Sequence, residues 1–245
     1  MIRFKHLALS ILLGMSSLSA QSADDVIQKT VDALGGAEKL RSVKSRLLVG
    51  EALLGGGVVS GDFRWLTLRP NYLKIEITVG DQMFVQAHDG KASWQIQPTQ
   101  FGGSGQVEIL AGPAAESVER SAVFESALLD YRKKGHKAEL LDPDDVRGKP
   151  AYHIKMTLAS GVVNEYFIDK ETYYPVKIVS TRFNPQTGGD VTVEQFATHY
   201  KAVSGIQIAH TLETYSGGQA INEFKVSEAE VDLETSAGDF KPPSS

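Results

Sequence analysis

The chain has 245 residues, of which 25 are basic and 30 acidic, so its formal net charge is −5, and it contains no cysteine. The missing cysteine excludes disulfides, thiol catalysis and cysteine-ligated metals. The negative charge excludes the basic surface that nucleic-acid binding needs, and the length suits one domain with its own core.

The first 23 residues have the pattern of a secretory signal peptide. Arg3 and Lys5 precede the apolar run 7–13, and small residues follow it. This run is far shorter than the roughly 20 residues that a membrane-spanning helix needs. We therefore expect export to the periplasm, with cleavage between Ala20 and Ala23. A lipoprotein signal would need a cysteine, so we expect no lipid anchor.

Two helices are expected next. Residues 24–34 carry apolar side chains at near-helical spacing, begin with two acidic residues and end at a glycine pair, which is typical of a capped amphipathic helix. Residues 37–43 predict a second, shorter helix. After it the apolar period changes from 3.6 residues to 2, which indicates strands.

The next part of the chain predicts a meander of antiparallel strands, at 46–54, 58–68, 72–78, 82–87 and 91–97. The first two flank three consecutive glycines, which can adopt positive φ in a turn without steric cost. Alternation places Leu73, Ile75 and Ile77 on one face of their strand, and Trp94 and Ile96 on one side of the last hairpin.

Residues 113–135 predict a longer helix. Apolar residues recur near helical spacing, Glu116 lies in the first turn, and three basic residues, 132–134, lie near the end, where they would complement the helix dipole. The glycine-rich stretch 102–105 before it is either a hinge or a plain surface loop.

The second half returns to period 2. Further strands are expected at 152–158, 162–168, 176–183, 191–200, 206–215 and 220–226. About ten or eleven strands with helices in front and one internal helix are typical of an α+β fold, not of repeating βαβ units. Residues 24–245 are expected to form a single domain.

The sequence carries no recognisable catalytic, cofactor or metal motif. No histidine pair has the His-Glu-x-x-His spacing of a zinc site, and His199 and His210 are better explained as side chains of neighbouring strands. The acidic cluster at 142–145 lacks the glycine and glutamate of a calcium loop and fits a solvated turn. Ser104 lacks the glycines of a nucleophile elbow. We expect no enzyme activity, cofactor or metal.

Between residues 61 and 98 the chain carries an ordered set of short motifs: Gly61-Asp62-Phe63, Arg69-Pro70-Asn71, Asp89-Gly90-Lys91, Trp94 and Pro98. This set resembles the LolA-like periplasmic lipoprotein carriers in order and nearly in spacing. The ending Phe240-Lys241-Pro242-Pro243 is similar to the family's Phe-x-x-Pro-Pro close. The chain ends soon afterwards, where the carriers continue, and its second half is longer, as in the uncharacterised LolA-like proteins.

The resemblance implies an incomplete antiparallel β-barrel covered by helices, with an apolar cavity for acyl chains. It also implies that Arg69 locks a helical lid by hydrogen bonds in the ligand-free form; the alternative is that Arg69 only ends a strand before Pro70. Trp94 fits a buried core residue as well as a ligand contact. The candidate cavity residues are Phe63, Trp65, Leu73, Ile75, Ile77, Trp94 and Ile96.

Three functions remain open from the sequence. The first is a periplasmic carrier of lipid or lipoprotein acyl chains, a monomer that contacts membrane-bound donor or acceptor proteins transiently. The second is a protein-interaction or envelope-sensing module without lipid cargo, and the third a lipid- or glycan-directed hydrolase. A sheet face filled by its own side chains would favour the second, and an open cavity the first.

Overall fold

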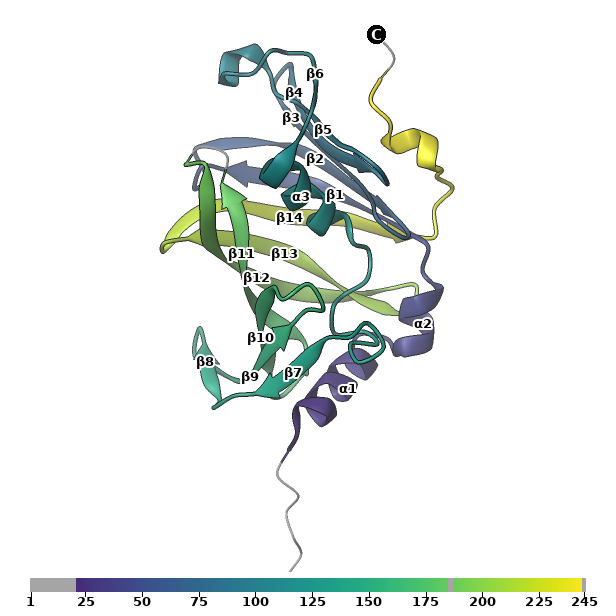
Figure 1. Ribbon diagram of the computed structural model, residues 1–245, viewed down its shortest axis with the longest axis vertical. Coiled ribbons are helices and arrows are strands. Elements are labelled where there is room, and N and C mark those ends of the chain that lie inside the picture. The colour runs from purple at the N-terminus through teal and green to yellow at the C-terminus, as the bar shows by residue number, and fades with distance from the viewer. Residues whose placement is uncertain (1–20, 185–186, 244–245) are drawn as a thin grey trace, which may run out of the picture.

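The computed structural model describes residues 21–184 and 187–243 (Figure 1). The expected signal peptide falls almost wholly on residues outside this part of the chain. No helix in the two described ranges combines the length and the apolar character needed to cross a bilayer.

The described residues form one antiparallel sheet of 14 strands that curls without closing (Figure 1). The strands are β1 (Ser45–Leu54), β2 (Val59–Leu68), β3 (Tyr72–Val79), β4 (Gln82–Asp89), β5 (Ser93–Ile96), β6 (Val107–Ile109), β7 (Lys137–Leu140), β8 (Asp144–Val146), β9 (Lys149–Thr157), β10 (Val163–Asp169), β11 (Pro175–Asn184), β12 (Gly189–Val203), β13 (Ile206–Ser216) and β14 (Gln219–Val231). Their order is β6-β5-β4-β3-β2-β1-β14-β13-β12-β11-β10-β9-β7, with β8 paired to β9. The α+β fold with an incomplete antiparallel barrel is therefore confirmed.

The strand count exceeds the expected ten or eleven because three short strands went unrecognised. These are β6, β7 and β8, which have only three or four residues each. Alternation over so few residues gives no distinct signal.

The helices are α1 (Ala23–Ala33), α2 (Ala37–Ser42) and α3 (Gly112–Ala122), with short 3-10 helices at Thr99–Phe101 (η1) and Ala237–Phe240 (η2). A capping box begins α1, because the Ser22 hydroxyl accepts from the Asp25 N–H and the Asp25 carboxylate accepts from the Ser22 N–H. Gly36 begins α2 at φ 85°, a conformation that suits glycine.

The expected helix over 113–135 is wrong in its second half, because α3 ends at Ala122. Val123 is extended, the Phe124 N–H donates to the carbonyl of Pro70 at 3.2 Å, and Asp130 has φ 54°. The apolar residues after Ala122 serve different neighbours, since Val123 is 58% exposed while Leu128 is buried. Residues 123–136, mostly turns, are called the cover segment below.

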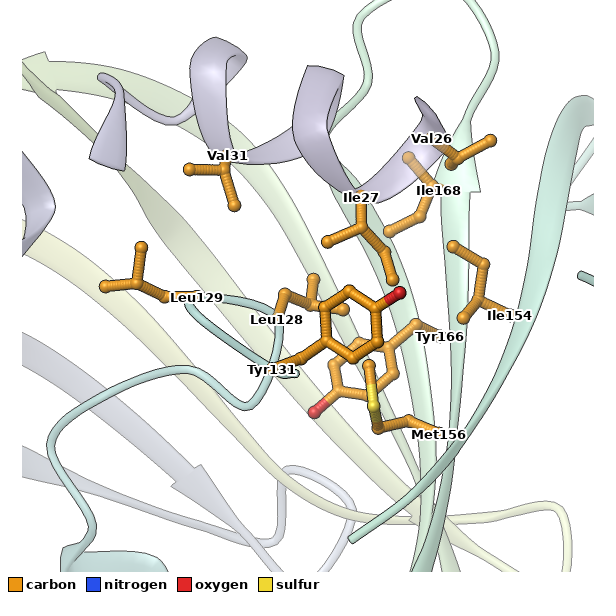
Figure 2. Close-up of a cluster of buried hydrophobic side chains, with 10 residues drawn as sticks. All are labelled: Val26, Ile27, Val31, Leu128, Leu129, Tyr131, Ile154, Met156, Tyr166 and Ile168. Carbon is orange, nitrogen blue, oxygen red and sulfur yellow. The ribbon is translucent and has the colours of Figure 1, made fainter. Parts of the chain in front are cut away.

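The three helices pack against the same face of the sheet, which we call the inner face. Figure 2 shows α1 and the cover segment contributing side chains to one buried cluster with β9 and β10: Val26, Ile27, Val31, Leu128, Leu129, Tyr131, Ile154, Met156, Tyr166 and Ile168. Val43, which follows α2, packs with Leu48 and Phe63. α3 lies inside the curl (Figure 1). Its Val118 and Ala122 pack on Leu73.

Candidate functional site

Five of the seven expected cavity residues lie together on the inner face, where they form an apolar strip across β2 and β3. Phe63 lies opposite Ile77 and Trp65 opposite Ile75 in the strand register, and Leu73 completes the set. The strip is packed rather than open: Phe63 is 3% and Leu73 0% exposed. Phe63 also makes an edge-to-face contact with Phe224, at 5.0 Å between ring centroids.

The other two expected residues, Trp94 and Ile96, lie on the opposite, outer face. The register places Trp94 opposite Ala87, which lies opposite Lys74. Trp94 is 1% exposed, and its indole Nε1 donates to the carbonyl of Phe240 at 2.8 Å. The sheet thus separates the expected set, because alternation shows which residues of one strand share a face but not how neighbouring strands are registered.

A groove of about 770 Å³ lies on this outer face, between β2–β5 and the C-terminal segment. Its apolar lining includes Leu66, Val85 and Trp94, and its charged lining includes Lys74 and Asp239. Sequence reasoning missed this groove, although the Phe240-Lys241-Pro242-Pro243 ending was the available signal for it.

Arg69, at the corner between β2 and β3, connects three parts of the chain. Its Nε donates to the carbonyl of Val43 at 2.6 Å and its Nη2 to the carbonyl of Leu40 at 2.8 Å, both at the end of α2. Its Nη1 donates to the carboxylate of Glu125 in the cover segment. The guanidinium also faces the Phe124 ring, at 4.7 Å from its centroid. We call this set of contacts the Arg69 latch.

Arg69 thus holds the end of one helix, α2, and a loop of the cover segment. The resemblance implied a helical lid, and the part of the cover segment that Arg69 reaches is not helical, because α3 ends at Ala122. Phe124 and Glu125, which sequence reasoning placed within the expected helix over 113–135, instead belong to the latch.

Ion pairs hold the cover segment at both ends, through Asp24, Glu125 and Asp130. Burial acts to raise the pKa of Glu125, but hydrogen bonds from Lys134 and Arg69 outweigh it, and the net shift is downward. Hydrogen bonds from Arg132 and Tyr131 lower the pKa of Asp24. Those from Arg41 and Lys133 lower the pKa of Asp130. All three carboxylates are therefore stabilised in the charged form.

One buried polar chain beneath α3 contains a serine and a histidine. The Ser93 hydroxyl donates to the carbonyl of Ala115 at 3.0 Å, so it accepts from His88 Nδ1, also at 3.0 Å. His88 Nε2 lies 3.4 Å from the Asn71 amide nitrogen. With its proton directed at a carbonyl and its side chain 3% exposed, Ser93 ties α3 to β5 rather than presenting a nucleophile.

The remaining polar candidates have local partners. His199 hydrogen-bonds Thr211, and His210 the carbonyl of Ile208. Asp145 accepts from the Gly148 N–H, which closes the turn between β8 and β9. Within residues 21–184 and 187–243, no three histidine or acidic side chains gather as a metal site requires.

Comparison with known proteins supports the fold. The sequence matches no family model and no curated protein. A domain described as an outer membrane lipoprotein-sorting protein from Vibrio parahaemolyticus is 16% identical, with a TM-score of 0.55 over 89% of this chain and 95% of that one. A LolA superfamily protein from Nitrosomonas europaea is 12% identical, with a TM-score of 0.55 over 91% and 98%.

A DUF1329 family protein from Desulfovibrio piger is 11% identical, with a TM-score of 0.57 over 89% of this chain and 97% of that one. At such identities the likeness concerns architecture alone. The chain has a LolA-like fold.

Proposed function

We propose that this LolA-like protein is a periplasmic carrier of lipid or lipoprotein acyl chains, and that it acts without enzymatic activity or a cofactor. The observation that carries the proposal is the Arg69 latch, which fastens α2 and the cover segment at the corner between β2 and β3. Those strands carry the apolar strip. A polar latch beside an apolar strip suits a protein that must open that strip and close it again.

The structure corresponds to the closed, ligand-free form in this proposal. The apolar strip is covered by its own neighbours, so it avoids water between rounds of transport. Opening breaks a small number of polar contacts, each with a net value of about 1–3 kcal/mol. Burial of a 16-carbon chain contributes about 12 kcal/mol relative to water, to be set against these polar contacts and against the apolar contacts that cover the strip in the closed form.

Release needs an apolar acceptor, because water offers the chain no comparable surroundings. A membrane or a membrane-bound acceptor protein provides them, and a donor delivers the chain in the same way. The protein is expected to work as a monomer that contacts these partners transiently.

Native mass spectrometry of the full chain isolated from its own periplasm tests the carrier function. A bound phospholipid, fatty acid or acylated peptide in the organic extract would support the carrier and identify its cargo. A protein that is isolated empty and, after lipid removal, binds no acyl chain in calorimetry would contradict it.

A second candidate is the protein-interaction module, and the filled inner face favours it. Phe63 and Leu73 are almost completely buried by the protein itself. In this function the helices stay in place and the partner binds the outside of the molecule. Co-purification of a periplasmic protein with a lipid-free chain, together with no acyl binding, would select this function.

A further inference from the structure

Arg46 is a cation on the inner face that has no counter-ion among the described residues. Its strand register places it opposite Thr67 on β2 and Val231 on β14. Neither an ion pair nor a hydrogen bond of its guanidinium is found in the described part of the chain. The Arg46 guanidinium instead lies over the Phe124 ring, whose centroid is 5.7 Å away.

The surroundings of Arg46 make this arrangement unfavourable in the closed form. Burial lowers the pKa of Arg46, and no acidic group in the described residues offsets the effect. Arg46 is half-buried, so its charge is only partly removed from water, and an anionic partner would relieve the cost that remains. Arg69, which touches the same ring, is paired with Glu125.

A second unsatisfied donor lies beside Arg46. The indole Nε1 of Trp65 is buried and has no acceptor in the described residues. Trp65 lies opposite Leu48, two residues along β1 from Arg46, so both side chains are on the inner face and diagonal to each other. A guanidinium fork and an indole N–H are the donors that a carboxylate or phosphate oxygen needs.

Phe124 links this pair of donors to the Arg69 latch. Its ring touches both arginines, and its backbone N–H is bound to the corner at Pro70. Opening the latch would withdraw the ring and leave Arg46 without its partial compensation. While the protein is closed, the Phe124 ring is the group that faces the Arg46 guanidinium.

We propose that Arg46 and Trp65 bind the anionic headgroup, a carboxylate or a phosphate, of the acyl cargo once Phe124 has moved aside. The inference rests on the proposed carrier function and adds to it the chemical class of the cargo: a single-chain or multi-chain amphiphile with an oxyanion at its head. The apolar strip holds the chain, and Arg46 fixes its end.

Arg182 is the alternative anion site on the same face. The register places it opposite Val191, near the hairpin between β11 and β12 and far along the sheet from Arg46. Burial lowers its pKa as well. Arg182 has no buried indole donor beside it, so we assign the headgroup site to Arg46. The experiment includes an Arg182 variant to test the alternative.

Calorimetric titration of the lipid-free mature chain tests the inference with three probes of equal chain length: dodecanoate, dodecyl phosphate and 1-dodecanol. The variants are Arg46→Met, Arg46→Lys and Trp65→Phe, with Arg182→Met as the rival. Arg64→Met is the matched control, since Arg64 is an arginine of the neighbouring strand β2 that pairs with Glu76 on the outer face. Circular dichroism melting checks that each variant folds.

We expect Arg46→Met to weaken the binding of the two anionic probes at least tenfold and to change the affinity for dodecanol less than twofold. Arg46→Lys should retain most of the preference for anions, and Trp65→Phe should lose a smaller part of it. Without ligand, Arg46→Met should melt at the same or a higher temperature, because the uncompensated charge is gone. The ratio of the affinities for dodecanoate and dodecyl phosphate shows which oxyanion is preferred.

If Arg46→Met weakens the binding of all three probes equally, or if Arg182→Met instead selectively loses affinity for the anionic probes, the assignment to Arg46 is overturned. The carrier function stays intact in both cases. Should Arg46→Met fail to fold, the Arg46→Lys and Trp65→Phe results decide alone, and unchanged preference in both would overturn it. Wild-type protein that binds none of the probes would overturn the carrier function and this inference together.

Discussion

Two arginine guanidinium groups contact the ring of Phe124, and they differ in what balances their charge. Arg69 has two carbonyls and the carboxylate of Glu125, whereas Arg46 has the ring alone among the described residues. One arginine therefore stabilises the closed arrangement, and the other is destabilised by it. A closed form that one arginine stabilises and the other does not suits a protein whose closed form gives way when a ligand binds.

Replacing Arg69 by methionine tests whether Arg69 stabilises the closed form. The variant loses hydrogen bonds to two carbonyls and a carboxylate, so we expect a loss of about 2 kcal/mol in the free energy of unfolding. Hydrogen exchange followed by mass spectrometry should show faster exchange in α2 and the cover segment.

Arg64→Met is the control for that experiment, because Arg64 forms a partly exposed pair with Glu76 on the outer face. We expect it to change stability by less than about 1 kcal/mol. Unchanged exchange in α2 and the cover segment of Arg69→Met would show that the latch does not hold them.

Much of the residue-level site lay beyond sequence reasoning. Motif order located Arg69, but its partners Leu40, Val43 and Glu125 come from segments whose approach only the fold determines. Alternation correctly placed Trp94 and Ile96 on the same side of their strand, but the register of β4 and β5 determines which face of the sheet that is. Arg46 gave no signal, since a charged residue in an alternating strand is normally assigned to the solvent side.

At the scale of elements, the cover segment is attached by ion pairs as well as by apolar contacts. Asp24, Glu125 and Asp130 bind it to α1, the latch and α2 through arginine, lysine and tyrosine partners. Leu128, Leu129 and Tyr131 add an apolar anchor. Its attachment should consequently depend on pH more than that of the sheet.

We expect the cover segment to loosen in acid before the sheet unfolds. The pKa values of these three carboxyls are lowered in the folded protein, so their contribution is complete above about pH 4, the range of an unperturbed carboxyl, and is lost as pH falls through the lower folded-state values. Hydrogen exchange at pH 7, 4 and 3 measures this. Simultaneous loss of protection in β9 and the cover segment would contradict it.

The contacts at the start of α1 predict that the signal peptide is cleaved after Ala20. Ser22 caps the helix, and Gln21 accepts a hydrogen bond from the Tyr152 hydroxyl at 2.7 Å. Cleavage after Ala20 keeps both contacts, whereas cleavage after Ala23 removes both. Intact-mass measurement of the exported protein checks this, and a mature chain beginning at Asp24 would refute it.

Element prediction succeeded where one pattern ran long enough. Strands of seven or more residues alternate clearly, and α1 has both an apolar stripe and caps. The region after Ala122 failed because its apolar residues satisfy helical spacing while packing against different neighbours. Tertiary contacts, which a single sequence does not display, end that helix.

At the scale of the whole molecule, one strand pair connects the two halves of the sheet. β1 pairs with β14, the last strand, and among the described strands this seam is the one that joins β1–β6 to β7–β14. A register shift between Val49 and Gly50 interrupts it. A Cβ atom at Gly50 would lie 2.0 Å from the Lys225 carbonyl oxygen, which explains the glycine.

Gly50→Ala should therefore destabilise the whole molecule, by about 1–3 kcal/mol, since backbone must move to admit the methyl group. Gly189→Ala, where the methyl group would meet open space, is the matched control and should stay within about 0.5 kcal/mol of wild type. Urea unfolding followed by circular dichroism measures both. Equal midpoints for the two variants would show that the seam tolerates the extra atom.

The chain has two tryptophans, and the sheet places one on each face: Trp65 in the apolar strip and Trp94 beneath the C-terminal segment. The protein therefore carries its own pair of optical reporters. Substituting phenylalanine for either leaves a single tryptophan, whose emission wavelength and quenching follow only one side of the sheet. Entry of a chain at the inner face and displacement of the C-terminal segment at the outer face can thus be timed separately in the unlabelled protein.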